Sequence, residues 1–333
     1  MSISLPQILP MRPFLREMVW GGRRLEQYGK QLPPGAPIGE SWELSAYPGM
    51  ESSVASGPLG GRSLQSLLEE YEEQLVGGPA WEACEGHFPL LVKLIDAGAD
   101  LSLQVHPDDE YARNHGLDRF GKMEAWYMLA AATGRFAAGL KNGVTREEFS
   151  RALEQGRALE TVEFHDACPD QVVFVPPGVV HAACAGIMIY EIQQSSDVTF
   201  RLYDYGRAGA DGKPRELHVD RGLEVIAFGE AAPAPIQLET WPPEGCTELV
   251  RSERFDLDLH VVGERGGRLA AGDSFFAVTV IEGVGLEYAA GDGSEGRLGL
   301  GETALVAPGG VAAVRASRPT KCLAASPPGG GCR

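Results

Sequence analysis

The sequence has little positive charge. Lysine and arginine together number 29 against 46 aspartate and glutamate residues, which gives a net charge of −17. A nucleic acid is repelled by such a surface unless a local basic stripe exists, and the sequence contains no run of basic residues. An anionic small substrate would need a local cluster of lysine or arginine against this overall field. We therefore expect no nucleic-acid partner.

Long hydrophobic runs and a secretory leader are also missing. No stretch reaches the roughly 18 consecutive apolar residues that a transmembrane helix needs. The N-terminal residues 1–7 have neither the basic region nor the apolar region of a signal peptide. We expect a soluble, cytoplasmic protein with no membrane partner.

The cysteines follow no pattern that would define a disulfide framework or a zinc ribbon. No two of them form a C-x-x-C pair, and their spacing is irregular. We interpret them as thiols, buried or exposed. The six are Cys84, Cys168, Cys184, Cys246, Cys322 and Cys332.

Glycine and proline are abundant, and they separate many short apolar runs. Runs such as 88–95, 171–175 and 274–281 predict strands of a β-sandwich or β-barrel. Few helices are expected, because few segments combine helical periodicity with a capping residue. The expected helices are 64–76 after Ser63, 145–155 with a capping box of Thr145 and Glu148, and 108–114.

A faint internal repeat indicates two related β-barrels. The pattern of Asp170, Pro176, Gly178 and His181 recurs as Glu302, Pro308, Gly310 and Ala313. Each copy has an apolar strand before the proline and a tight turn after it. Alanine replaces the histidine in the second copy, and the only histidine beyond His218 is His260. The second barrel is therefore not expected to build a histidine-based metal site alone.

The stretch 231–235, Ala-Ala-Pro-Ala-Pro, is the best candidate for a linker. It divides the 333 residues into two parts, and two domains are usual at this length. We predict a catalytic, metal-binding domain over 1–230 with a helical insertion at about 108–165. A degenerate barrel follows over 236–326, and 327–333 form a tail.

Three short segments carry side chains that can bind a metal. In an alternating strand, Gln104 and His106 point to one face while Leu103 and Val105 point to the other. Glu124 lies in an apolar segment, where a buried carboxylate needs a metal or another cation. His181 follows an apolar strand and a Pro-Pro-Gly turn.

Taken singly, each of these residues has an ordinary structural explanation, such as a solvated strand face or a hydrogen-bonded core histidine. Together, His106, Glu124 and His181 form a set of two imidazoles and one carboxylate, with Gln104 as a fourth ligand or neighbour. Such donors suit zinc, iron or manganese. Two strands and a Pro-x-Gly-x-x-His turn are also how a cupin barrel presents a metal, so the predicted fold is mainly β, with two cupin-type (jelly-roll) barrels.

The segment 189–207 is dense in polar groups beside an apolar strand. Arg201 and Arg207 could bind an anion or stabilise an oxyanion. The simpler interpretation is a surface loop with a salt bridge, for instance between Asp197 and Arg201.

Several of these segments, in this order, resemble the type I mannose-6-phosphate isomerases in their short bacterial form. The resemblance covers about residues 10–230 and fades in the C-terminal part. Its most specific strings are Gln-Val-His-Pro at 104–107 and Glu-Ile-Gln-Gln-Ser-Ser-Asp at 191–197. The other matching segments are 20–22, 39–45, 89–96, 121–127 and 176–181.

The resemblance implies a role for each matching residue. The metal ligands of the family match His106, Glu124 and His181, with Gln104 at the position of a glutamine that many members use. The catalytic arginine matches Arg201. Two active-site lysines match Lys93 and Lys122, and an acidic neighbour matches Asp197. Met123 and Phe200 depart from the threonine and tyrosine that are common in the family, and neither is a ligand.

The implied reaction interconverts mannose 6-phosphate and fructose 6-phosphate through an enediol. The implied cofactor is one divalent metal ion, and zinc is the ion that the donors favour. Arg201 would stabilise the developing oxyanion beside the metal. Lys122 or Lys93 would transfer a proton or bind phosphate, and a lysine base would need a lowered pKa. The sequence does not choose between the two lysines.

Two other functions fit part of the pattern. Two histidines and a carboxylate in a cupin also describe iron oxygenases, which have no obvious use for two lysines and an arginine nearby. A sugar-binding cupin without catalytic activity would be expected to have lost a ligand, and all ligands are present here. The oligomeric state is not readable from the sequence.

Overall fold

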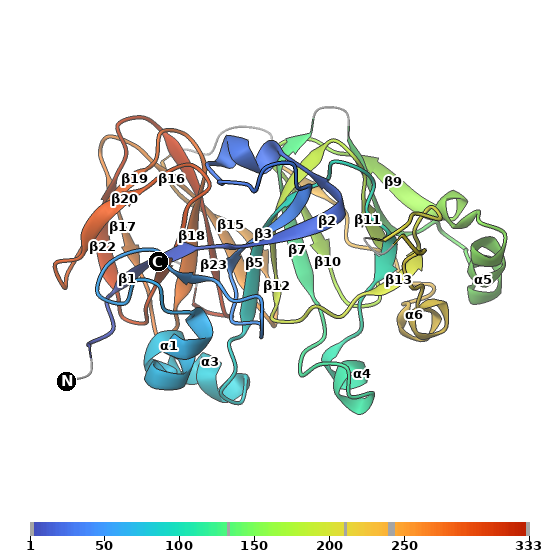
Figure 1. Cartoon of the computed structure of the whole chain (residues 1–333), viewed down its shortest axis with the longest axis horizontal. Coiled ribbons are helices and arrows are strands. Elements are labelled where there is room, and N and C mark those ends of the chain that lie inside the picture. Colours follow the sequence, from blue (N-terminus) through green and yellow to red (C-terminus); the bar gives the residue numbers. More distant parts are fainter. Residues whose placement is uncertain (1–2, 132–133, 210–211, 239–243, 331–333) are drawn as a thin grey trace.

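The protein is built mainly from antiparallel strands, as the sequence predicts. The computed structural model describes residues 3–131, 134–209, 212–238 and 244–330. Within these residues the strands form two seven-stranded sheets, one five-stranded sheet and one four-stranded sheet. Figure 1 shows the four sheets side by side along the long axis of the molecule, with a large sheet and a small sheet in each half. Each half is thus a two-sheet sandwich of the predicted class.

The first half contains the segments that carry the predicted metal ligands. Its large sheet has the order β14 (Ile236–Gln237), β10 (Gln171–Val175), β7 (Glu124–Ala131), β12 (Ile187–Gln194), β5 (Leu90–Asp96), β3 (Ile38–Leu44) and β2 (Phe14–Gly22). Its small sheet has the order β13 (Phe200–Tyr203), β6 (Leu103–Val105), β11 (His181–Ala183), β8 (Arg135–Leu140) and β9 (Val162–Asp166).

The second half consists mostly of C-terminal strands. Its large sheet has the order β15 (Gly245–Arg251), β16 (Asp256–Val262), β23 (Thr320–Ser326), β18 (Phe276–Glu282), β21 (Thr303–Val306), β1 (Ile8–Arg12) and β4 (Ser53–Val54). Its small sheet has the order β17 (Gly267–Ala270), β22 (Val311–Arg315), β19 (Leu286–Ala290) and β20 (Glu295–Leu298).

The core is layered in the same way as the sheets. The two large sheets face each other across one apolar cluster, which includes Val92, Tyr190, Leu257 and Leu323. In each half, a further cluster fills the space between the large and the small sheet. Because side chains alternate along a strand, the residues between those on the shared core face point toward the small sheet. This alternation directs the polar residues of β7 and β12 toward β6 and β11.

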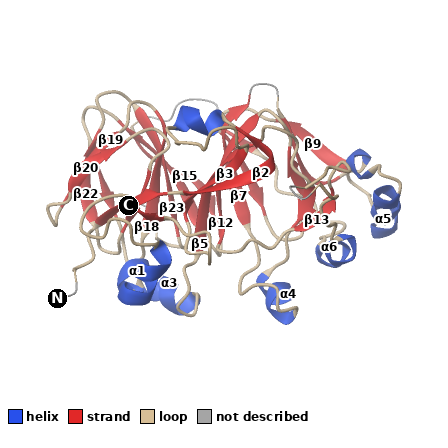
Figure 2. Cartoon of the chain, in the orientation of Figure 1, coloured by secondary structure: helices blue, strands red, loops and turns tan. Residues whose placement is uncertain are grey.

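The helices lie outside the sheets, as Figure 2 shows. Ser63 caps α1, Asp108 caps α4, and Thr145 and Glu148 form the expected capping box of α5. The segment predicted as one helix over 64–76 is broken at Glu72, whose φ of 47° is incompatible with a continuous helix. The helical elements are η1 (Arg24–Tyr28), α1 (Leu64–Tyr71), α2 (Glu73–Val76), α3 (Gly78–Ala83), α4 (Asp109–Asn114), α5 (Arg146–Glu154), η2 (Ala158–Glu160) and α6 (Val219–Val225).

Two details concern the predicted domain organisation. The range 108–165 contains α4 and α5, but it also contains β7, β8 and most of β9, so it is not a purely helical insertion. Strands β1 and β4, from the N-terminal part of the chain, pair into the large sheet of the second half. The domain boundary itself stays a prediction. Residues 331–333 of the predicted tail, with Cys332, lie outside the described residues.

The internal repeat has a structural counterpart. In the first copy, β10 of the large sheet leads through a turn to β11 of the small sheet. In the second copy, β21 of the other large sheet leads in the same way to β22.

Among the described helices, none has the length and apolar character needed to cross a membrane.

Candidate active site

The three predicted metal ligands converge between the two sheets of the first half. Their potential ligand atoms all lie within 4.8 Å of one another, and all three side chains are buried. Nε2 of His106 is 3.4 Å from Oε2 of Glu124, and Nε2 of His181 is 3.3 Å from Oε1 of the same carboxylate. The carboxylate therefore lies between two imidazole nitrogens, an arrangement that can hold a metal ion.

Backbone carbonyls orient both imidazole rings. Nδ1 of His106 donates to the carbonyl of Val198 at 2.9 Å, and Nδ1 of His181 donates to the carbonyl of Val179, also at 2.9 Å. With Nδ1 protonated, the Nε2 lone pairs point toward Glu124, as in many histidine metal sites. Burial, together with Lys122, lowers the pKa of His106 to about 3, and burial lowers the pKa of His181. Both rings are thus neutral near pH 7, the form in which histidine binds a metal.

Lys122 is the cation that accompanies Glu124 in this structure. Its ammonium group contacts Oε2 of Glu124 and lies 3.1 Å from Nε2 of His106. Burial raises the pKa of Glu124, but Lys122 and the two imidazoles outweigh burial and hold that pKa well below its usual value. Oε1 of Glu124 is buried and has no hydrogen-bond partner among the described residues. This unsatisfied oxygen and the two nitrogens fit a divalent metal ion.

Gln104 links the predicted ligands to Arg201. Strand β6 lies between β11 and β13, and Gln104 is the register partner of both His181 and Arg201. Its Nε2 lies 3.2 Å from Nε2 of His181. The three side chains thus form a row across three antiparallel strands, and the arginine is one strand away from the glutamine.

Arg201 and Arg215 form a cationic group beside this row. One guanidinium nitrogen of Arg201 donates to the carbonyl of Glu216 at 2.8 Å, while its buried Nε has no partner among the described residues. Asp204 holds Arg215 through two hydrogen bonds and also accepts one from Arg207 at 2.8 Å. Burial and the nearby charge of Arg215 lower the pKa of Arg201. An anion placed here would relieve this repulsion.

Lys93 lies across the cavity in a carboxylate-rich environment. Its Nζ donates to Oε1 of Gln193 at 2.6 Å and lies 3.1 Å from Oε1 of Glu191. Burial opposes its charge, but Glu191 and the other nearby carboxylates raise the pKa of Lys93 above the usual value. Trp126 donates to the second oxygen of Glu191 at 2.8 Å. Burial and the negative charge of Glu124 raise the pKa of Glu191, and Lys93 only partly offsets them.

Asp197 pairs with Arg16, so the alternative of a local salt bridge to Arg201 is wrong. The guanidinium of Arg16 donates to Asp197 at 3.1 Å and to Glu40 at 3.4 Å. Glu40 also accepts from the indole of Trp42 at 2.7 Å. Strands β2 and β3 therefore position the loop that carries Asp197.

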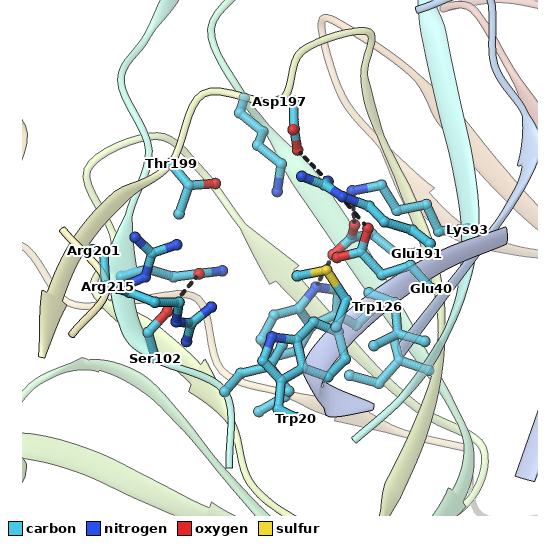
Figure 3. A pocket seen from close by; sticks show the side chains of 18 residues that line it. Trp20, Glu40, Lys93, Ser102, Trp126, Glu191, Asp197, Thr199, Arg201 and Arg215 are labelled. Atoms are coloured by element: carbon cyan, nitrogen blue, oxygen red, sulfur yellow. Dashed lines mark hydrogen bonds and ion pairs between the residues drawn. The ribbon is translucent and has the colours of Figure 1, made fainter. Parts of the chain in front are cut away.

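Many of these side chains, Lys122, Arg201 and Glu191 among them, border one cavity with a volume of about 220 Å³, whereas the three predicted metal ligands are not among its lining residues. Figure 3 shows Arg201, Arg215 and Ser102 on one side, Lys93 and Glu191 on the opposite side, and Asp197 and Thr199 toward the top of the view. The remaining lining residues are Arg16, Met18, Trp20, Glu40, Ile95, Leu101, Gln104, Lys122, Trp126, Ala183 and Ile189. The cavity is thus cationic at one end and holds paired charges at the other.

Comparison with known proteins identifies the family. The model of the phosphomannose isomerase type I catalytic domain matches residues 8–130. The mannose-6-phosphate isomerase ManA of Bacillus subtilis is 34% identical over 281 residues, which cover 82% of this chain and 85% of that protein. The chain belongs to the type I phosphomannose isomerase family. A mannose-6-phosphate isomerase of Streptococcus mutans is 35% identical over 221 residues, which cover 66% of this chain and 68% of that protein.

The fold comparison agrees with this assignment. The crystal structure of the mannose 6-phosphate isomerase from Bacillus subtilis superposes with a TM-score of 0.84 at 29% identity, and the match covers 96% of this chain and 99% of that one. The predicted fold class and enzyme family are therefore confirmed.

In this member of the type I phosphomannose isomerase family, the structure adds residues that the sequence did not single out. Arg215, Arg16, Glu40 and Glu191 all line the cavity. Alternation within 187–194 could have indicated Glu191, since it shares a face with Gln193. Nothing local indicated Arg215 or Arg16, because they reach the cavity only through the packing of distant segments. Arg207, considered as an anion-binding residue, pairs with Asp204 and is not among the lining residues.

Proposed function

We propose that this protein interconverts mannose 6-phosphate and fructose 6-phosphate in a metal-dependent reaction. The observation that carries the proposal is the convergence of His106, Glu124 and His181 beside a cavity that also contains Arg201 and Arg215. Membership of the type I phosphomannose isomerase family supports the substrate and the reaction.

We propose that His106, Glu124 and His181 hold one divalent metal ion, with Gln104 as a fourth ligand or close neighbour. Two neutral imidazoles and a carboxylate are donors that suit zinc. When bound, the metal would supply Lewis acidity that stabilises negative charge on a sugar oxygen.

Lys122 has a distinct part in this proposal. Its ammonium group lies against the same atoms of His106 and Glu124 that a metal would use. Two cations would not share these atoms, so with a metal bound the ammonium group of Lys122 would be displaced toward the cavity that this residue lines. There its ammonium group becomes available to a sugar oxygen or to the phosphate as a point charge.

The phosphate of the substrate belongs at the arginine end of the cavity. Arg215 is fixed there by Asp204, and the hydroxyl-bearing residues Ser102 and Thr199 line the same cavity. A guanidinium fixed by a carboxylate binds phosphate in a defined orientation. Arg201, one strand from Gln104, lies between this end and the predicted metal ligands and can donate to an oxygen of the enediolate.

Isomerisation removes a proton from C2 of the aldose and returns a proton to C1, and the intermediate is an enediol. The environment of Lys93 favours its ammonium form, because the nearby carboxylates raise its pKa, and this argues against Lys93 as the base. Glu191 is buried in the cavity wall and has a raised pKa. A buried carboxyl group with a raised pKa can accept a proton and return it. We therefore propose Glu191 for proton transfer, with Lys93 as its positioning partner.

The experiment is a coupled assay that follows fructose 6-phosphate formed from mannose 6-phosphate, with and without a chelator. The chelated protein should be inactive, and added zinc should restore activity. His181→Ala should lose activity and one equivalent of bound metal relative to the unmodified protein. His87→Ala, at an exposed histidine outside the cavity lining, is the matched control and should retain both. Full activity of His181→Ala would disprove the proposal.

A further inference from the structure

A second cluster of metal-ligating side chains lies in the other half of the molecule. Cys246 on β15 is the register partner of His260 on β16, and Asp258 precedes His260 by two residues. The ligand atoms of the three residues lie within 4.8 Å of one another. The sequence offered only one histidine in this part of the chain, and strand pairing brings a cysteine and an aspartate to it.

This cluster faces the interior of the second sandwich. On the neighbouring strand β23, the partners of His260 and Asp258 are Cys322 and Ala324. Both belong to the apolar cluster between the large and small sheets of the second half. Since cross-strand partners project from the same face of a sheet, His260 and Asp258 project toward the small sheet as well. The cluster thus occupies the same layer in the second half as the first site does in its own.

Asp258 and His260 each have a buried polar atom that lacks a hydrogen bond. Asp258 is 1% exposed and His260 is 6% exposed. Oδ2 of Asp258 and Nε2 of His260 have no hydrogen-bond partner among the described residues. A buried polar atom without a hydrogen bond is unfavourable, so two such atoms in one cluster point to a ligand that would engage both.

The charged side chains around the cluster carry an excess of negative charge, which favours a bound cation. Arg251 contacts Oδ1 of Asp258, which leaves Oδ2 unengaged by that ion pair. Glu248 and Asp256 also pair with Arg251, so the acidic groups here outnumber that arginine. Cys246 is exposed and lines, with His260, a cavity of about 440 Å³, which gives an ion a path to the cluster.

We propose that Cys246, Asp258 and His260 form a second divalent metal site of the zinc class. A thiolate, an imidazole and a carboxylate are ligands that zinc accepts, whereas magnesium and calcium prefer oxygen ligands alone. Binding would release the thiol proton of Cys246, because the thiolate is the ligand. The ion would join β15, an edge strand, to β16 within the second half.

Cobalt(II) offers a probe that separates this site from the first one. A cobalt ion bound by a thiolate has a sulfur-to-metal charge-transfer band in the near ultraviolet. The proposed first site contains no cysteine, so this band reports only the second site. The protein is stripped with a chelator, titrated with cobalt chloride and followed by absorption. We expect the band to saturate at one ion per chain, and its absence would overturn the proposal.

Variants decide whether the three residues act together. Cys246→Ser, at an exposed position, should lose the band and lower the zinc content from about two ions per chain to about one. His260→Gln should weaken cobalt binding at least about tenfold. Cys168→Ser, at another exposed cysteine, is the control and should keep the band. A band that persists in Cys246→Ser, or that is equally strong in His260→Gln, would overturn the three-residue site.

The outcome is independent of the proposed isomerase activity. In His181→Ala the charge-transfer band should be unchanged, and zinc should still raise the melting temperature. In the double variant that combines His181→Ala with Cys246→Ser, zinc should raise the melting temperature no more than it raises that of an unrelated protein of similar charge. Failure of the first site would leave these results intact, and failure of the second site would leave the coupled assay unchanged.

Discussion

Lys122 is a buried cation beside a buried carboxylate and two neutral imidazoles. An unpaired carboxylate in this position would lose its hydration without compensation. The ammonium group therefore stabilises the carboxylate of Glu124 in this structure. If the proposed metal ion binds, the protein should depend on Lys122 for stability less when it is loaded with metal than when it is metal-free.

Replacing Lys122 with methionine should destabilise the metal-free protein by roughly 3–5 kcal/mol, since it leaves Glu124 buried without its partner. The zinc-loaded variant should lose much less, because the ion replaces the ammonium group. Urea unfolding with and without chelator measures the difference. Lys141→Met, at an exposed lysine, should change neither value. Equal losses in both states would contradict the interpretation.

Arg201→Lys should lower turnover about 100–1000-fold while metal content and folding stay intact. A guanidinium can donate two hydrogen bonds to the enediolate, whereas an ammonium provides a point charge. Steady-state kinetics should show the loss in kcat. If Arg201 bound the phosphate equally in ground and transition states, the Michaelis constant would rise and turnover would hold.

Lys93→Met should shift the acid limb of the pH profile of kcat/KM to higher pH. Lys93 lowers the pKa of Glu191, so its removal leaves the carboxyl protonated over a wider range. A base must be deprotonated, so activity at low pH falls further. The shift should be roughly 1–3 pH units, as expected for the loss of a nearby opposite charge. An unshifted profile would remove Glu191 from this role.

At the scale of single residues, the sequence indicated the predicted ligands because alternation defines which side chains share a face. Gln104 and His106 do project away from Leu103 and Val105, which pack in a separate apolar cluster on the outer face of the small sheet of the first half. Arg215 could not be predicted, because its place depends on Asp204 and on a loop whose path is set by tertiary packing.

At the scale of elements, the row from His181 through Gln104 to Arg201 depends on strand register. A shift of one residue in β6 would turn Gln104 and His106 to the opposite face. The short sequence of β6 predicts its faces but not its neighbours. Pairing of β6 with β11 and β13 joins segments about 77 and 97 positions apart, and no local pattern encodes such partners.

Helix α5 provides a test that is independent of the active site. Thr145→Ala removes a side-chain cap and one half of the capping box, and it should cost about 0.5–2 kcal/mol of folding stability. The helix packs through Phe149 against the outer face of the small sheet of the first half, away from the cavity. Activity should therefore be unchanged. Ser150→Ala, in the same helix but outside the cap, should be close to neutral in the same unfolding experiment.

The helix caps were the most predictable elements, because capping depends on residues three positions apart. Ser63 and Thr145 cap helices as expected, and Asp108, expected as the first residue of a helix, is the cap of α4. The break at Glu72 was not predictable, since glutamate ordinarily favours helix and its positive φ is imposed by the surroundings.

At the scale of the whole molecule, the two large sheets share one apolar core. Strand β1 contributes Leu9 to this core from the large sheet of the second half. Leu9→Ala should destabilise the whole protein by roughly 2–5 kcal/mol, because it opens a cavity between the sheets. Thermal unfolding should remain a single transition, and two separated transitions would show that the halves unfold independently. Ile3→Ala, at an exposed residue, is the control.

The pairing of β1 with β21 joins two strands that are synthesised far apart in time. Ile8 leaves the ribosome roughly 300 residues before its partner Val306. At about 5–20 residues per second, the first strand waits roughly 15–60 s for a place in a sheet. During that time its apolar side chains are exposed on the nascent chain. The last strands to be synthesised therefore complete a sheet in which β1 lies between β21 and β4, and a ribosome that stalls before β21 releases a chain in which β1 lacks that partner.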